Sequence, residues 1–340
     1  MPLGSEHLRL RDRAATALEA SGLGALVRRV GAWRGLLVLN YHQVANAERD
    51  LIDPSLWSAT EEQLDEQLRF LTRHLEVVGP EVLDSGPPAR AQVMLTFDDG
   101  YRDNHDLALP VLRDHDVPAV FFVTSGFLDE PTLPWWGELH WMLTASERTS
   151  LTLERWPAGP DGGTVILDGS RATLERLRAG YESVAPSDQQ AFMDEVAAAL
   201  GVDRPRDRGD AVWMTWDMVR ALRDAGMTIG GHTATHPRLA DLPADEQARE
   251  VDAGLRRLQD ELDERPTLFS YPYGGRDAFD QRTVAALRDA DIRFAFSYYG
   301  GYNRNNSWDP YDLKRVSATA TATPARRRAM VTLPRQFARW

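Results

Sequence analysis

The chain has 340 residues, of which 43% are hydrophobic, so it is long enough to bury the core of one large α/β barrel or of two domains. Its 39 Lys and Arg residues against 51 Asp and Glu residues give a formal net charge of -12, which disfavours nucleic acid as a partner. Because the chain has no cysteine, disulfides and thiolate metal sites are excluded, and a metal would need His and carboxylate ligands.

The two ends of the chain are basic. Residues 1–34 have helical character, residues 321–340 form a basic tail, and arginines in both are interspersed with apolar residues. Such ends could make peripheral contact with an anionic membrane face, and the alternative is that both are solvated extensions. The arginines are Arg9, Arg11, Arg13, Arg28, Arg29, Arg34, Arg326, Arg327, Arg328, Arg335 and Arg339. With no signal peptide and no apolar stretch of membrane-spanning length, we expect a cytoplasmic protein, or one peripheral to a membrane.

Residues 35–320 alternate between runs rich in β-branched and aromatic residues and runs with helical spacing, which is typical of parallel βαβ units. The predicted strands are 36–41, 93–97, 118–124, 227–231, 268–272, 293–297 and 313–317. The predicted helices are 61–74, 104–115, 217–225, 244–262 and 279–290, with a break or kink at Pro110. Seven strands predict an α/β fold in the form of a barrel.

The alternation fails at residues 131–212. Three tryptophans begin this segment, a patch rich in Gly and Pro follows at 157–163, and the remainder has helical character. We therefore predict a partly helical insertion between consecutive strands of the barrel.

Two adjacent carboxylates, Asp98 and Asp99, follow the apolar residues 95–97 and precede Gly100. Like charges this close raise one pKa unless a cation neutralises one member, which would leave the other able to accept a proton. Taken alone, the pair is more simply explained as an ordinary Asp-Asp-Gly turn that closes a strand. The sequence therefore offers a candidate metal ligand next to a candidate base.

Two histidines, His232 and His236, follow another predicted strand. At a spacing of four, both would lie on one face of a helical turn and could reach one ion. Two imidazoles and one carboxylate leave coordination positions open, as a hydrolytic metal requires. A third predicted strand ends in Tyr-Pro-Tyr-Gly, where the backbone N–H of Tyr273 could stabilise an oxyanion.

Together, the Thr-Phe-Asp-Asp-Gly, His-Thr-Ala-Thr-His and Tyr-Pro-Tyr-Gly segments resemble the NodB-homology polysaccharide deacetylases, the fourth carbohydrate esterase family. The resemblance extends over about residues 36–317 and implies a distorted (β/α) barrel. It also implies that Asp98 is the general base and that Asp99, His232 and His236 bind a divalent metal. The implied metal is zinc, with cobalt, manganese or nickel as alternatives.

Two residues of the family pattern are missing. The chain has no histidine after His236 to protonate the leaving amine, and Ser270 stands where many members have an arginine that orients the base. His42, which closes the first predicted strand, is our candidate acid, and its alternative role is a hydrogen bond within the barrel. Arg315 on the last predicted strand is the candidate base-orienting residue.

Aromatic rings stack well on sugars, and Trp135, Trp136 and Tyr298 are candidate substrate contacts, although large aromatic residues more often pack in cores. The expected partner is an N-acetylated glycan, namely a polysaccharide, an oligosaccharide or a lipid-linked glycan, and no obligate protein partner is evident. Two other functions stay open: an O-acetyl esterase or cyclic-amide hydrolase of the same fold, and a sugar-binding protein with degenerate catalysis.

Overall fold

A computed structural model of the chain describes residues 5–31, 33–45, 57–86, 89–156, 163–304, 308–318 and 322–338. These residues belong to two compact units. The barrel unit comprises Met1–Ala45, Trp57–Glu130 and Trp213–Trp340, and the insertion unit comprises Asn46–Leu56 and Pro131–Val212.

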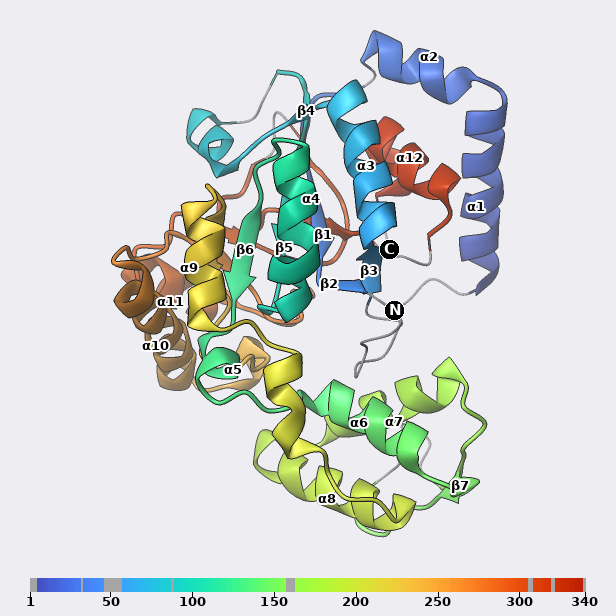
Figure 1. Cartoon of the computed structure of the whole chain (residues 1–340), viewed down its shortest axis with the longest axis vertical. Helices are drawn as coiled ribbons and strands as arrows, with labels where there is room; N and C mark the ends of the chain where they lie inside the picture. Colours follow the sequence, from blue (N-terminus) through green and yellow to red (C-terminus); the bar gives the residue numbers. More distant parts are fainter. Residues whose placement is uncertain are drawn as a thin grey trace. The chain divides into compact units, whose positions relative to one another are not determined.

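The barrel unit is built on a curled, mostly parallel sheet, which confirms the predicted fold class (Figure 1). Its strands are β1 (Gly35–Tyr41), β5 (Ala91–Phe97), β6 (Val120–Val123), β9 (Thr228–Gly231), β10 (Leu268–Ser270), β11 (Phe294–Phe296) and β13 (Arg315–Ser317). From β1 to β11, each of these strands pairs in parallel with the next. Strand β13 pairs with β1, and a parallel bridge joins Phe296 to Leu313, so the sheet curls back to its first strand.

The strands are short apolar runs because both of their faces are buried. All seven residues of β1 and the last five of β5 are buried. The short strands β4 (Glu76–Val77) and β12 (Asn303–Arg304) join this sheet, and β2 (Gln43–Ala45) pairs with β3 (Trp57–Thr60). These short strands carry too few residues for an alternating pattern, and the sequence did not predict them.

The predicted helices form at or close to their expected residues. They are α3 (Glu61–His74), α4 (Leu109–Asp114), α9 (Trp216–Asp224), α10 (Ala244–Leu262) and α11 (Gln281–Asp289), and α5 (Ser125–Asp129) adds a short turn after β6. Capping boxes start two of them, at Thr60 for α3 and at Asp280 for α11. The irregularity expected at Pro110 is a π-helical stretch, Asn104–Ala108, directly before α4, because proline cannot donate the usual helical hydrogen bond.

Both ends of the chain fold as helices that pack together beside α3 (Figure 1). They are α1 (Ser5–Ala20), α2 (Leu23–Val30), α12 (Pro324–Thr332) and α13 (Pro334–Phe337). The indole of Trp33 donates to the carbonyl of Val331 at 2.9 Å, and Arg28 donates to the Thr332 hydroxyl at 2.7 Å. Within the described ranges, no helix is both long and apolar enough to cross a membrane.

The insertion unit has its own apolar core. Its elements are α6 (Trp135–Ala145), β7 (Ser150–Leu151), β8 (Val165–Ile166), α7 (Arg171–Ser183) and α8 (Gln189–Leu200), with β7 and β8 pairing antiparallel. A buried ion pair joins Arg204 to Glu138 of α6 at 2.6 Å.

Candidate active site

The candidate residues converge at the end of the barrel where the parallel strands finish. Asp98 and Asp99 follow β5 directly, and His232 follows β9. The N–H of Asp98 donates to the carbonyl of Tyr41, the last residue of β1, at 2.9 Å. Loops at this end of parallel barrels are the usual location of active sites.

Asp99, His232 and His236 form a compact cluster. Their ligand atoms all lie within 4.8 Å of one another, and Oδ1 of Asp99 is 3.2 Å from Nε2 of His232 and 3.3 Å from Nε2 of His236. The Nδ1 of His232 lies 2.7 Å from the carbonyl of Ser270, which orients its Nε2 toward Asp99. Burial would raise the pKa of the Asp99 carboxyl, but the two facing imidazoles hold that pKa well below its usual range.

The segment from His232 to His236 is an irregular loop, and our expectation of a helical turn was wrong. Thr233 and His236 have φ angles of 66° and 63°, and Pro237 disfavours a helical conformation at the residue before it. Glu250 of α10 fixes the loop by accepting hydrogen bonds from the N–H groups of Ala234 and Thr235. The histidines therefore converge through loop geometry and not through helical periodicity.

Backbone strain is concentrated at this site. Asp99, Thr233, His236 and Tyr273 are non-glycine residues with positive φ. The other described non-glycine residues with positive φ are three aspartates at the ends of helices, where aspartate tolerates this conformation: Asp116, Asp263 and Asp291. Strained backbone that the surrounding fold maintains is characteristic of functional sites.

Asp98 is held by a bidentate ion pair with Arg315 of β13. Its two carboxylate oxygens each accept a hydrogen bond of 2.8 Å from the guanidinium, and both side chains are buried, at 2% and 0% exposure. Arg315 is the residue that the sequence suggested as the base-orienting partner. Ser270, in the position where many family members have arginine, accepts a 2.7 Å hydrogen bond from the same guanidinium.

A buried polar network surrounds this ion pair. The Asn40 amide donates to Asp98 at 3.1 Å, and its oxygen accepts from Arg315 at 2.9 Å and from the Thr96 hydroxyl at 2.8 Å. The Ser270 hydroxyl donates to Asp98 at 3.2 Å. Burial would raise the pKa of Asp98, but the charges of Arg315 and His232 outweigh it and lower that pKa. Asp98 is therefore an ionised, oriented carboxylate. Sequence analysis gave no role to Asn40 or Thr96, although Thr96 begins the Thr-Phe-Asp-Asp-Gly segment.

His42 lies at the same end of the barrel, directly after β1. Its N–H donates to the Ser58 hydroxyl at 2.8 Å, and its carbonyl accepts from the Asn104 amide at 2.7 Å, so its backbone is fixed. Its ring is 5.5 Å from that of Tyr298. Burial lowers the pKa of His42 although the charges of Asp99 and Asp98 act to raise it, so the neutral imidazole is its resting form at pH 7.

Tyr273 occupies the turn after β10. Its ring lies 5.3 Å from that of His236, so its backbone N–H belongs to a residue beside the cluster of Asp99, His232 and His236. A side chain at Gly274 would meet Cβ of Tyr298 at 2.5 Å, so this turn requires glycine.

The three aromatic candidates for sugar contact have different surroundings. Within the insertion unit, Trp135 is partly buried and stacks on Tyr181 at 4.0 Å, and Trp136 is buried. Tyr298 lies at the catalytic end of the barrel, beside His42 and with its ring 5.7 Å from the guanidinium carbon of Arg315. Burial raises the pKa of Tyr298 to about 12, so its phenol stays protonated at neutral pH.

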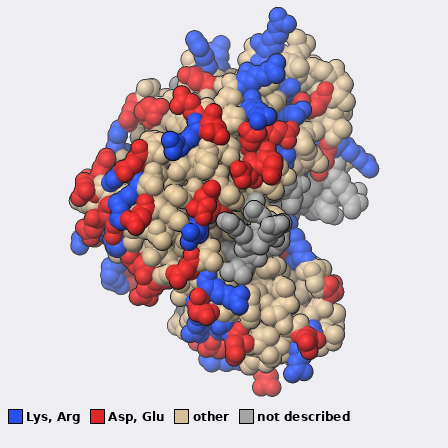
Figure 2. All heavy atoms as spheres, viewed as in Figure 1, with Lys and Arg blue, Asp and Glu red and all other residues tan. Residues whose placement is uncertain are grey.

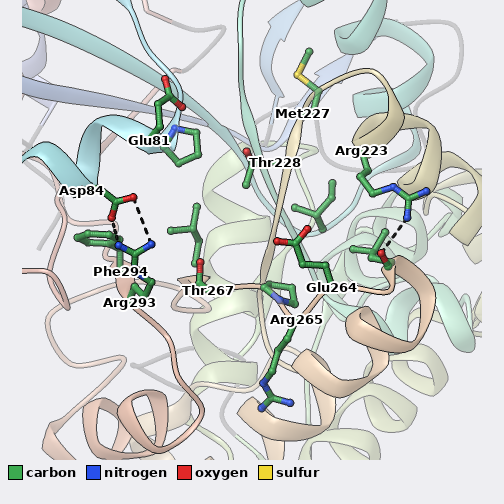
Figure 3. Close-up of a pocket in the computed structure, with 15 residues that line it drawn as sticks. Glu81, Asp84, Arg223, Met227, Thr228, Glu264, Arg265, Thr267, Arg293 and Phe294 are labelled. Carbon is green, nitrogen blue, oxygen red and sulfur yellow. Dashed lines mark hydrogen bonds and ion pairs between the residues drawn. The ribbon is translucent and has the colours of Figure 1, made fainter.

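A hollow of about 290 Å³ lies at the opposite end of the sheet, where β9, β10 and β11 begin (Figure 3). Acidic and basic side chains both line it, and Arg293 is paired there with Asp84. Because Asp98, Asp99 and the two histidines follow the ends of the strands, this hollow is separate from the candidate site.

Solved structures with the same fold, at low sequence identity, include deacetylases. The Streptococcus pyogenes deacetylase PplD is 16% identical with a TM-score of 0.52, and the alignment covers 86% of this chain and 94% of that one. IcaB from Ammonifex degensii is 18% identical with a TM-score of 0.53, covering 88% and 96%. A de-N-acetylase from Aggregatibacter actinomycetemcomitans is 16% identical with a TM-score of 0.53, covering 85% and 96%. These similarities establish the fold.

Sequence comparison identifies the family. A stretch of 44 residues is 46% identical to an uncharacterized 30.6 kDa protein of Geobacillus stearothermophilus, covering 13% of this chain and 17% of that protein. The model of the family described as polysaccharide deacetylase matches residues 85–160 and 189–295, more than half of the chain. The chain therefore belongs to the polysaccharide deacetylases, the NodB-homology family of hydrolases that act on non-peptide carbon–nitrogen bonds.

Proposed function

We propose that this deacetylase hydrolyses the N-acetyl group of an amino sugar, with a divalent metal at Asp99, His232 and His236 and with Asp98 as the base. The observation that carries the proposal is the pairing of two carboxylates with opposite environments. Asp99 faces two imidazoles, whereas Asp98 is neutralised by Arg315 and directed by a buried network. Two adjacent acids with separate partners can perform separate roles in one reaction.

The chemistry of the cluster fits a divalent cation. Oδ1 of Asp99 is buried and, among the described residues, accepts no hydrogen bond of normal geometry, while two imidazole nitrogens face it. One carboxylate and two imidazoles suit zinc and also cobalt, manganese or nickel, and they leave coordination positions open. When bound, such a cation supplies Lewis-acid chemistry, polarising the acetamide carbonyl and lowering the pKa of a coordinated water to about 7.

The residues of the chain supply the remaining steps. Asp98 accepts a proton from the attacking water, and Arg315 keeps this carboxylate ionised and oriented. The N–H of Tyr273 donates to the carbonyl oxygen as negative charge develops on it. The acyl carbon–nitrogen bond then breaks, acetate leaves, and the amine nitrogen gains a proton.

We assign the donation of that proton to His42. Its fixed backbone and its electrostatic coupling to Asp98 and Asp99 support this role. Since the resting imidazole is neutral, the proton that His42 delivers must be one released within the same turnover, passed on from Asp98.

The first test of this function combines metal analysis with acetate release. We expect purified protein reconstituted with zinc or cobalt to bind about one equivalent of metal and to release acetate from N-acetylglucosamine oligosaccharides. His236→Ala should lose both properties, whereas His105→Ala, a control histidine paired with Asp106, should retain both.

The substrate panel separates the remaining alternatives. Release from acetyl-xylan alone would replace the proposal with an O-acetyl esterase, and turnover of a cyclic ureide alone would indicate a cyclic-amide hydrolase. Absence of both metal and acetate release would favour a sugar-binding protein. Arg315 weakens that last alternative, because it supplies the guanidinium that the sequence lacked at position 270.

The second test concerns His42. We expect His42→Gln to lower kcat by about 10²-fold or more, with little change in KM or in bound metal, because only protonation of the leaving amine is impaired. A substrate with an activated amide, whose leaving amine needs no proton, should be hydrolysed by the variant at nearly the wild-type rate. Normal kcat on the sugar substrate would instead assign both proton transfers to Asp98.

A further inference from the structure

Exposed large apolar side chains are concentrated on helix α2. Leu23, Leu26 and Val30 are 51%, 57% and 71% exposed, and their spacing of three and four places them along one face of the helix. The only other exposed large apolar residues in the described part of the chain are Leu10, Ile166 and Tyr273. A contiguous apolar stripe on a surface helix marks an interaction site.

Five arginines lie on α2 itself or at the end of the barrel where the strands begin. Arg34 directly precedes β1, and the carbonyl of Arg90, just before β5, accepts the N–H of Gly35 at 3.1 Å. Arg304 of β12 pairs in register with the same glycine. Arg29 lies on α2 itself, and Arg73 lies in the last turn of α3.

These arginines are available to bind an external anion. All five are exposed, and none forms an ion pair with any residue that the structure describes. Of the acidic groups on the neighbouring elements, Glu19 is ion-paired with Arg28, whereas Glu76 accepts a hydrogen bond from the neutral Gln92 amide and keeps its charge. Figure 2 shows Lys and Arg side chains gathered at the end of the barrel unit where Figure 1 places α2.

We propose that this basic–apolar face, formed by Leu23, Leu26, Val30, Arg29, Arg34, Arg73, Arg90 and Arg304, binds the surface of an anionic lipid bilayer. The chain as a whole has a net charge of -12, so an anionic surface would repel most other orientations. An eight-residue helix offers little apolar area, and the flanking arginines supply the second interaction that stable peripheral binding needs.

This orientation directs the catalytic end away from the lipid. The arginines precede β1 and β5, whereas His42 and Asp98 follow the same strands, and seven strand residues separate the two ends by roughly 23 Å. The proposal therefore predicts a bilayer-bound enzyme whose active site faces the aqueous phase.

Vesicle co-sedimentation of the full chain tests the proposal. We expect binding to vesicles of phosphatidylcholine mixed with phosphatidylglycerol, weak binding to phosphatidylcholine alone, and loss of binding as salt concentration rises. Equal binding to both vesicle types, or no binding to either, would overturn it.

Matched variants test whether this face is the part of the protein that binds the vesicles. Leu23→Ser/Leu26→Ser/Val30→Ser should abolish sedimentation with anionic vesicles, whereas Ile166→Ser, which removes an exposed apolar residue of the insertion unit, should leave it unchanged. Arg34→Gln/Arg90→Gln should weaken binding by about fivefold for each charge removed, and Arg148→Gln/Arg171→Gln should weaken it far less.

Acetate release from a small soluble substrate should be unchanged in all these variants, which verifies that they are folded. If the apolar triple variant binds vesicles as the wild type does, the proposal is wrong. It is also wrong if the wild type self-associates and only the triple variant is monomeric, because the face would then join two copies of the chain.

Discussion

Asp98→Asn should lower kcat for acetate release by about 10²- to 10⁴-fold while the enzyme retains its metal, because the substitution removes the proposed proton acceptor and leaves the proposed ligands Asp99, His232 and His236 in place. The asparagine side chain has nearly the same shape as aspartate, so substrate should still fit and KM should change little. Steady-state kinetics combined with metal analysis of the same preparation would measure both quantities.

A matched control is Asp106→Asn. It removes a partly exposed carboxylate of the π-helical stretch, which is paired with Arg102 and His105. We expect nearly normal kcat for this control. Full activity of Asp98→Asn would exclude Asp98 as the base, and loss of metal would show that Asp98 supports the ligand cluster instead.

Arg315→Met should be strongly destabilising as well as inactivating. Both partners of its ion pair with Asp98 are buried, and removing one member of a buried pair typically costs about 3–5 kcal/mol of unfolding free energy. The double variant Asp98→Asn/Arg315→Met should recover much of that stability, because no buried charge remains unpaired, but it should stay inactive. Denaturant unfolding of the four proteins would complete the double-mutant cycle.

The same pair predicts a pH dependence. Arg315 is a main cause of the lowered pKa of Asp98, so the charged pair stabilises the fold above the unfolded pKa of aspartate and loses this effect as pH falls through the native pKa. In Arg315→Lys, a weaker and less directed cation should let the pKa of Asp98 rise. The acid limb of kcat/KM should then move to higher pH, and an unchanged limb would mean that Arg315 does not control ionisation of the base.

Local sequence patterns were sufficient to predict the main sheet and its covering helices. A parallel strand buried on both faces is an uninterrupted apolar run, and an amphipathic helix repeats its apolar residues at three and four, so both signals lie within a few neighbouring residues. The insertion was also visible, because its tryptophans and Gly/Pro-rich patch interrupt the alternation. The short strands β2, β3, β4 and β12 carry no comparable signal.

The candidate site was predictable where its residues are adjacent in the chain and less so where distant segments assemble it. The four-residue spacing of His232 and His236 identified them as a candidate pair. The geometry of the loop between them, however, depends on Pro237 and on contacts with α10. The role of Asn40 in the polar network could not be predicted, because the network forms only when β5 and β13 pair with β1. Trp135, a candidate sugar contact, stacks on Tyr181, and that contact between distant segments could not be predicted from the sequence.

The pairing of Asp98 with Arg315 has a consequence for when the enzyme first becomes competent during its synthesis. The two residues are 217 positions apart, and Arg315 reaches Asp98 only after the last strand has docked against β1. Contacts this distant in sequence carry a large entropic cost of chain closure and tend to form late in folding. A nascent chain that ends before residue 315 already contains the three proposed metal ligands and the proposed base, yet it lacks the counter-charge of Asp98. The enzyme can therefore become active only when the barrel is complete. An unfinished chain has no ordered active site and cannot hydrolyse its substrate.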